Sequence, residues 1–176
     1  MDRYTVISAD CHAGADLLDY REYLDPDFRD EFDSWAAAYV NPFADLADAD
    51  KAKIALNINL DSVAGSPNLA ALTSGYAGVE PFLLNVATTN GHSLRTVRPL
   101  MTNSDHAIFA LGGIPAIRLV AGFDDPAAHL RLVLTPADTR DKVAQSELRQ
   151  ATLVTAALLS ATCNADPSDV AAWRTR

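Results

Sequence analysis

The sequence predicts an α/β fold with a largely parallel or mixed sheet. Segments of strand character alternate with segments of helical periodicity, and one strand segment is mostly apolar, as expected for a strand covered on both faces. No stretch reaches the roughly 18 uninterrupted apolar residues that a membrane span requires. With 176 residues, the chain is expected to form one domain around one core.

The first 50 residues predict one strand and one helix. Residues 4–8 are a short β-branched run, which is typical of a strand. Residues 25–40 place apolar side chains at three- and four-residue spacing, which indicates an amphipathic helix with Pro26 in its first turn. An Asn-Pro pair ends this helix, and the acidic residues 44–50 are expected to form a linker or a helix end.

The rest of the chain predicts alternating strands and helices. Strands are expected at residues 53–61, 69–73, 94–97 and 116–120. Helices are expected at residues 79–89, 105–111 and 144–162. In the last helix, the side chains predicted to pack against the sheet are Leu148, Ala151, Thr152, Thr155, Leu158 and Leu159.

Composition and charge exclude several classes of function. A net charge of -9 and the absence of any Lys/Arg run argue against nucleic-acid binding. The N-terminus is acidic where a signal peptide is basic, so we expect a cytoplasmic protein without membrane association. Residues 1–50 carry 13 acidic and 3 basic side chains, whereas residues 51–176 carry 10 and 11. This asymmetry suggests two segments of separate origin or environment.

Three side chains at predicted strand ends are candidate metal ligands. Asp61 ends the mostly apolar strand, and ligands of open α/β sheets collect beyond the carboxyl ends of strands. A carboxylate there suits a metal ion, and it equally suits the cap of the following turn. Asp10 and His12 follow the first strand at a spacing that puts both on one face, so they are weaker candidates.

Four segments resemble motifs of the co-catalytic zinc aminopeptidases, the family that includes aminopeptidase Y and the glutamate carboxypeptidases. In family order they are residues 58–65, 103–109, 113–117 and 137–142. The resemblance covers about residues 53–163 and implies the C-terminal half of such a peptidase, a partial three-layer α/β/α mixed sheet. It implies that Asp61 is a zinc ligand, that zinc is the cofactor and that the substrate is a peptide or amide.

The resemblance also shows which ligands are missing. The family binds two zinc ions through five protein ligands beside a general base, and most of these residues belong to its N-terminal half. Residues 1–52 do not match that half, and the chain contains no adjacent Glu-Glu pair. The last family ligand, a histidine four residues before an Asp-Thr motif, corresponds here to Leu134, which cannot bind zinc.

Four further residues are candidates for support of the site. The resemblance assigns Asp105 and His106 to the active-site loop, where they would hydrogen-bond backbone or neighbouring groups. The alternative is a helix cap for Asp105 and a partly buried polar residue for His106. Asp138 and Thr139 are expected to end a loop and to cap the approach to the last helix.

The N-terminal segment resembles a different hydrolase family. Residues 6–14, 18–25, 30–35 and 41–46 are similar to the start of the amidohydrolase-related proteins, which are (β/α)₈ barrels whose first strand delivers a pair such as Asp10 and His12 to a metal. The match stops near residue 48, whereas a barrel needs about 250 residues. The chain is therefore interpreted as an incomplete amidohydrolase-like segment, residues 1–48, joined to an aminopeptidase-like half-domain, residues 49–176.

Three functional hypotheses follow. The leading one is a zinc-aminopeptidase-like protein that is catalytically incomplete. The second is a new metal site made by Asp10, His12 and Asp61, with hydrolase activity on amides or esters. The third is a non-catalytic binding or assembly module, in which exposed sheet edges pair in a homo-oligomer.

Overall fold

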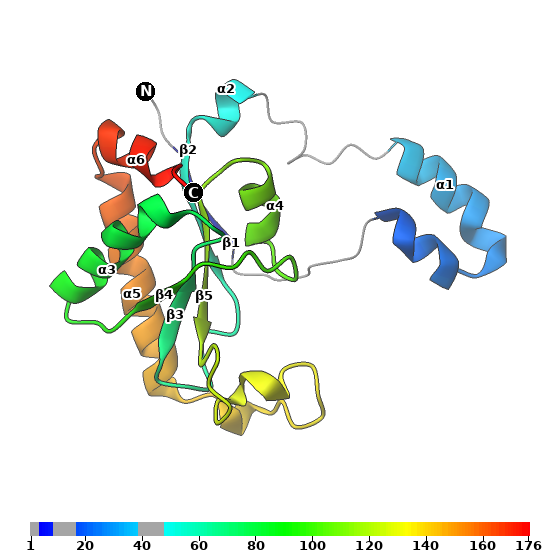
Figure 1. Ribbon diagram of the computed structural model, residues 1–176. Helices are drawn as coiled ribbons and strands as arrows, with labels where there is room; N and C mark the ends of the chain where they lie inside the picture. Colours follow the sequence, from blue (N-terminus) through cyan, green and yellow to red (C-terminus); the bar gives the residue numbers. More distant parts are fainter. Residues whose placement is uncertain (1–3, 9–16, 39–47) are drawn as a thin grey trace.

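The computed structural model describes residues 4–8, 17–38 and 48–176, and it shows a mixed sheet with helices on both faces (Figure 1). The strands are β1 (Tyr4–Ser8), β2 (Ile54–Leu60), β3 (Leu69–Leu72), β4 (Arg95–Val97) and β5 (Ala116–Ala121). Their order in the sheet is β1-β2-β5-β3-β4. Strands β1, β2 and β5 are parallel, β3 runs antiparallel to β5, and β4 is parallel to β3. The predicted mixed α/β fold is confirmed.

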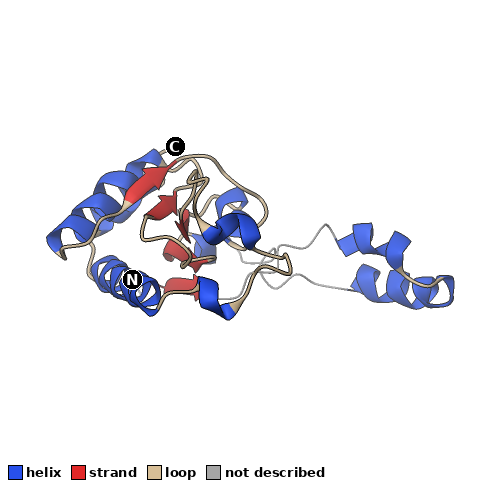
Figure 2. Cartoon of the chain, turned by 90° about the horizontal axis from the view of Figure 1, so that it is seen from below, coloured by secondary structure: helices blue, strands red, loops and turns tan. Residues whose placement is uncertain are grey.

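Helices cover the sheet unequally. They are α1 (Arg29–Ala38), α2 (Asp48–Lys51), α3 (Glu80–Thr89), α4 (His106–Leu111), α5 (Gln145–Cys163) and α6 (Pro167–Trp173). Helices α3, α5 and α6 lie on one face of the sheet and α4 lies on the other, as Figures 1 and 2 show. Short 3-10 helices complete the structure at Leu17–Tyr23, Pro26–Phe28, Ala77–Val79, His129–Leu132 and Arg140–Lys142.

Alternation along β2 explains why the sheet has one apolar and one polar side at this strand. Ile54, Leu56 and Ile58 are buried and join the main core. The intervening side chains point the other way because successive residues of a strand alternate between faces. Asn57 and Asn59 lie on that other side, and both are fully buried. The strand therefore carries polar groups into the layer that α4 covers.

Most of the main core lies between the sheet and α3, α5 and α6, and Phe109 and Ala110 of α4 also belong to it. Its fully buried members include Leu83 of α3, Val154 and Leu158 of α5, and Ile117 and Leu119 of β5. Trp173 of α6 is 2% exposed and packs against the ring of Phe82, with 4.3 Å between the ring centroids. Helix α6 was not predicted from the sequence, although Pro167 at its start is a recognised helix signal.

The predicted N-terminal helix forms, but its apolar side does not reach the sheet. Helix α1 follows the 3-10 turn Pro26–Phe28, and it packs against the 3-10 helix Leu17–Tyr23, where Arg21 forms an ion pair with Asp33 at 2.7 Å. Phe28 is 59% and Trp35 51% exposed. In Figures 1 and 2 this helical pair lies apart from the sheet.

Helix α5 confirms the predicted long helix, but part of its predicted packing face is wrong. Ala151, Thr155 and Leu158 are buried as predicted and Leu159 is half-buried, whereas Thr152 is exposed and Leu148 is 44% exposed. Leu148 lies in the first turn, where the neighbouring Glu147 accepts a hydrogen bond from the backbone of Gly65 at 2.8 Å instead. Across the described ranges, no helix combines the length and apolar character needed to cross a bilayer.

Candidate functional site

A pocket of about 380 Å³ opens where the parallel strands β2 and β5 end at the same edge of the sheet. Asp61 directly follows β2, and its backbone N–H donates to the carbonyl of Leu119 at 3.2 Å. The pocket lining combines a few polar groups with apolar walls: Asp61, Ser62, Met101, Asn103, Arg118, Phe123, Leu130, Val133 and Leu134. Such a mixture is typical of a small-molecule or peptide-binding site.

An ion pair between Asp61 and Arg118 forms the polar part of this pocket. The Arg118 Nη2 lies 3.0 Å from the Asp61 Oδ2, and the two side chains are 8% and 16% exposed, respectively. The other Asp61 oxygen accepts a hydrogen bond from the Ser62 hydroxyl at 3.1 Å. Arg118 Nη1 donates to the Asn103 side-chain oxygen at 3.3 Å. Both carboxylate oxygens of Asp61 therefore already have hydrogen-bond donors.

His106 lies behind this ion pair, at the start of α4. Its side chain is fully buried, and neither ring nitrogen has a hydrogen-bond partner among the described residues. Burial lowers the pKa of His106 to about 4, the positive charge of Arg118 acts in the same direction, and the negative charge of Asp61 opposes them. The imidazole is therefore neutral at physiological pH.

A row of polar side chains continues from the ion pair along β2. Asn59 donates to the Ser104 hydroxyl at 2.6 Å. Both side-chain polar atoms of Asn57 are buried and lack a partner within the described ranges. Asn57, Asn59 and Asp61 are two residues apart, so they share one face of the strand. The polar layer under α4 is thus built by one strand and extends well beyond Asp61.

Two residues of the pocket hold a backbone conformation that side chains disfavour. Ser62 has φ 59° and Leu134 has φ 63°. For a bulky residue such as Leu this left-handed conformation is a genuine outlier. Leu134 is also 97% exposed, although it lines the pocket. Strained backbone of this kind clusters at binding sites, which agrees with the location of both residues.

The predicted site residues do not all come together. Asp61 lies near His106, and its negative charge opposes the lowering of the His106 pKa. Asp105 precedes α4, but its side chain does not cap that helix. Asp138 and Thr139 are exposed in the loop before α5 and do not line the pocket; Thr139 contacts the carboxylate of Asp141. Asp10 and His12 lie outside the described residues.

Arg118, Asn57 and Asn59 are parts of the site that sequence reasoning missed. Each signal was present: Arg118 is a charged residue inside an apolar strand, and the two asparagines precede Asp61 at the alternating spacing of a strand face. A charge within a buried strand requires a partner, since an unpaired buried charge is costly. Arg118 is therefore expected to pair with a carboxylate at the same edge of the sheet.

Zinc does not fit the donor groups that the structure describes. Within residues 4–8, 17–38 and 48–176 no group of three or more His, Cys, Asp or Glu side chains could hold a metal ion. Asp61 is engaged by Arg118, and Leu134 offers no donor atom. Structural and catalytic zinc sites use three or four protein ligands, so this pocket falls short of that number.

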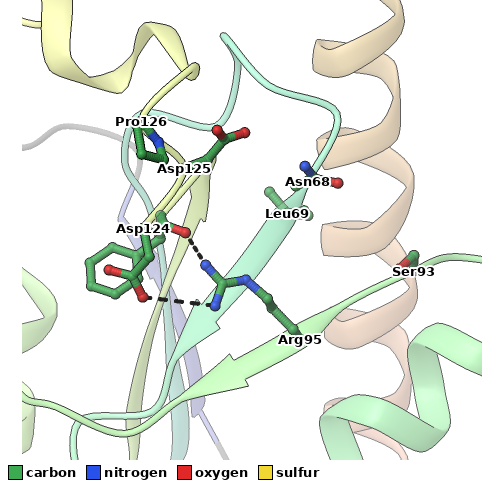
Figure 3. Close-up of a pocket in the computed structure, with 8 residues that line it drawn as sticks. Asn68, Leu69, Ser93, Arg95, Asp124, Asp125 and Pro126 are labelled. Atoms are coloured by element: carbon green, nitrogen blue, oxygen red, sulfur yellow. Dashed lines mark hydrogen bonds and ion pairs between the residues drawn. The ribbon is translucent and has the colours of Figure 1, made fainter.

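A second pocket of about 450 Å³ lies beside the first and shares Phe123 with it (Figure 3). In Figure 3 Arg95 points toward Asp124, and the two charges are 3.9 Å apart. Arg95 also donates to the backbone carbonyl of Phe123. Both partners of this pair are about half exposed or more, so water screens their interaction. This pocket is more solvated than the first and contains no buried charge.

Comparison with known proteins identifies relatives of this fold. The model of peptidase family M28 matches residues 36–159, a range that begins upstream of the predicted join near residue 50. Among curated proteins, none matches the chain.

Solved structures of aminopeptidases have a fold similar to that of this chain. A zinc aminopeptidase from Bacillus subtilis is 25% identical, with a TM-score of 0.58 over 72% of this chain and 33% of that one. An aminopeptidase from Aneurinibacillus sp. strain AM-1 is 18% identical, with a TM-score of 0.53 over 84% of this chain and 30% of that one. The LapA aminopeptidase of Legionella pneumophila is 16% identical, with a TM-score of 0.52 over 63% of this chain and 31% of that one. The chain thus spans about a third of the length of these enzymes.

Proposed function

Because the chain belongs to peptidase family M28, we propose that it is a zinc-aminopeptidase-like protein that keeps the C-terminal part of the catalytic scaffold and has little or no peptidase activity. The aminopeptidase Y and glutamate carboxypeptidase group within the family is the proposed origin. If the chain is active, its substrate is a peptide or amide and its cofactor is zinc.

One observation carries this proposal. The pocket that contains Asp61 is also lined by Leu134, and the resemblance to the family places Leu134 where a histidine ligand would stand. Where the family chemistry needs a second donor near the aspartate, this chain therefore supplies an apolar side chain. A single carboxylate that is already ion-paired supports neither the binding of two zinc ions nor the activation of a bridging water.

Hydrolysis of aminoacyl-anilides in the presence of added zinc or cobalt tests the proposal. We expect turnover no faster than that of a heat-denatured control. Turnover that EDTA abolishes and that Asp61→Ala removes would contradict it. Asp138→Ala is the matched control, because that exposed carboxylate lies outside the pocket lining.

The N-terminal residues 1–48 are proposed to be an amidohydrolase-like segment joined to the aminopeptidase-like residues 49–176. Strand β1 supports a structural use of this segment, because it pairs in parallel with β2 and forms one edge of the sheet. A continuous reading frame through residues 46–53 in transcripts would support a natural join. Separate transcripts for the two parts would contradict it.

A second candidate is a metal site made from Asp10, His12 and Asp61. It is favoured by the register of the sheet, in which Ser8 of β1 lies opposite Asn59 of β2, so that both strands end at the same edge. Three protein ligands and a water would suffice for zinc. Metal analysis of the purified protein tests it: stoichiometric zinc that His12→Ala and Asp61→Ala each abolish would support this candidate. The absence of bound zinc would exclude it.

A third candidate is a binding or assembly module. Exposed apolar side chains on the N-terminal helical pair favour it: Leu18, Tyr23, Phe28 and Trp35 are each more than half exposed. The outer strands β1 and β4 add sheet edges that could pair with another chain. Sedimentation over a range of concentrations tests this candidate. A homo-oligomer that Phe28→Ser weakens would support it, and a monomer at every concentration would contradict it.

A further inference from the structure

The partly buried carboxylate of Asp61 requires a positively charged partner. Its side chain is 16% exposed and sits at the end of a central strand, where water screens charge poorly. An ionised carboxylate in such a place is stable only when it is paired or coordinates a metal. The similar Bacillus subtilis protein is described as a zinc aminopeptidase, so a metal ion belongs to that enzyme. In this chain the described donors do not make a metal site.

Arg118 supplies the missing charge. It projects from β5, whose backbone is held on both sides, since Arg118 lies opposite Asn59 of β2 and Leu72 of β3. Its guanidinium contacts the Asp61 carboxylate at 3.0 Å and the Asn103 amide oxygen at 3.3 Å. A guanidinium keeps its charge at all relevant pH values and binds in a fixed planar geometry. Arg118 is therefore a fixed positive charge whose two terminal nitrogens are held by Asp61 and Asn103.

We propose that Arg118 is a built-in counter-ion that takes the place of a metal at Asp61, so that Asp61 stabilises the fold and shapes the pocket. This inference rests on the proposed origin of the chain in a zinc-peptidase scaffold. A cation that approached the same carboxylate would meet both the occupied oxygens and the fixed charge of Arg118. Metal binding at Asp61 is thereby opposed twice, by lost hydrogen bonds and by repulsion between like charges.

The first test is a double-mutant cycle with thermal unfolding as the readout. Asp61→Asn and Arg118→Met each leave one buried charge or donor without its partner, and each is expected to lower Tm by about 5–10 °C. The double variant D61N/R118M leaves no buried charge, so it should recover more than half of the summed loss. Additive losses in the double variant would overturn the proposal.

Two further variants keep the test informative. Arg118→Lys retains the charge but not the planar fork, so its Tm should fall between those of the wild type and R118M. Arg95→Met is the matched control at the same sheet edge, because the Arg95–Asp124 pair is 3.9 Å long and its side chains are 46% and 67% exposed. Its Tm should change by less than about 2 °C. A loss as large as that of R118M would contradict a special role for Arg118.

Metal binding provides the second readout. Neither excess zinc nor EDTA should shift the Tm of the wild-type protein, and calorimetric titration with zinc alone should show no site that Asp61→Asn removes. A zinc-dependent rise in Tm that D61N abolishes would overturn the counter-ion role. The proposed function is tested separately. Metal-dependent anilide hydrolysis would refute the proposal of an inactive peptidase, whereas the double-mutant cycle tests only the ion pair between Arg118 and Asp61.

Discussion

The imidazole of His106 is held neutral inside the fold. It is fully buried without a partner for either ring nitrogen in the described part of the chain, and its pKa is lowered to about 4. In the unfolded chain the pKa returns to about 6.5. Between these values the unfolded chain binds a proton that the folded chain does not, so stability rises with pH.

We therefore expect the burial of His106 to lower the free energy of unfolding of the protein in acid. The contribution is complete above about pH 6.5 and is lost as the pH falls from there toward 4, at a total of roughly 3 kcal/mol. Urea unfolding measured at several pH values between 4 and 8 should show this slope in the wild type. In His106→Leu this slope, which measures how many more protons the unfolded chain binds than the folded chain, should be smaller by the equivalent of about one proton. An unchanged slope would mean that His106 binds its proton equally in the folded and unfolded chains, so that its pKa is not lowered by folding.

Leu134 stores backbone strain at the rim of the pocket. Its left-handed conformation (φ 63°) costs about 1–2 kcal/mol for a residue with a side chain, while glycine loses about 0.5–1 kcal/mol of chain entropy. Because Leu134 is 97% exposed, its removal loses little packing. Leu134→Gly should therefore raise the free energy of unfolding by about 0.5–1 kcal/mol.

Leu134→Ala separates the two causes in the same urea experiment. It removes the apolar side chain but keeps the strain, so its free energy of unfolding should stay within about 0.5 kcal/mol of the wild type. Equal stabilisation by Ala and Gly would show that the gain comes from the side chain. A loss in both would show that Leu134 makes contacts that stabilise the fold.

At the scale of elements, Arg174 ties α6 to the start of the sheet. Its guanidinium donates to the backbone carbonyls of Ile54, Ala52 and Gly113 at 2.9, 3.3 and 3.1 Å. These carbonyls belong to the first residue of β2, the turn that precedes β2 and the turn before β5. Because charge-assisted hydrogen bonds are stronger than neutral ones, this one side chain joins three segments that are far apart in the sequence.

Arg174→Ala is expected to lower the free energy of unfolding by about 1.5–3 kcal/mol. Arg149→Ala is the matched control, since Arg149 is an exposed residue on α5, and its effect should stay within about 0.5 kcal/mol. Urea unfolding of both variants measures the difference. Similar losses in the two would show that the contacts of Arg174 contribute little.

Strands and long helices could be predicted from this sequence because each has a local signal. β2 is recognisable by its apolar residues and α5 by its helical spacing, and both form close to the predicted bounds. The packing of α1 could not be predicted in this way. Periodicity shows that a helix has an apolar side, but what that side meets depends on contacts between distant segments. In the structure Phe28 and Trp35 are more than half exposed, and α1 lies apart from the sheet (Figure 1).

The candidate site was predictable only in part for a similar reason. Asp61 could be singled out because a strand end is visible in the sequence. Arg118 lies 57 positions later, and its pairing with Asp61 depends on β5 lying next to β2 in the sheet. The sheet order, which brings the second and fifth strands together, is a property of the whole molecule. A single sequence carries no direct signal for it.

At the scale of the whole molecule, the two tryptophans report on two different parts of the fold. Trp173 of α6 is 2% exposed within the main core, whereas Trp35 of α1 is 51% exposed on the N-terminal helical pair. Helix α1 contains no buried residue. Segments with few buried contacts open at low free energy, so the helical pair should lose structure before the sheet does.

The variant Trp35→Phe isolates the signal of Trp173. Its remaining fluorescence should be blue-shifted and several-fold less sensitive to acrylamide than that of the wild type, because acrylamide cannot reach a buried ring. Its main urea transition should stay within about 0.5 kcal/mol of the wild type, since an exposed side chain contributes little. In the wild type, the Trp35 signal should change at lower urea than the Trp173 signal. Coincident transitions would contradict separate stabilities and would show that α1 unfolds together with the sheet.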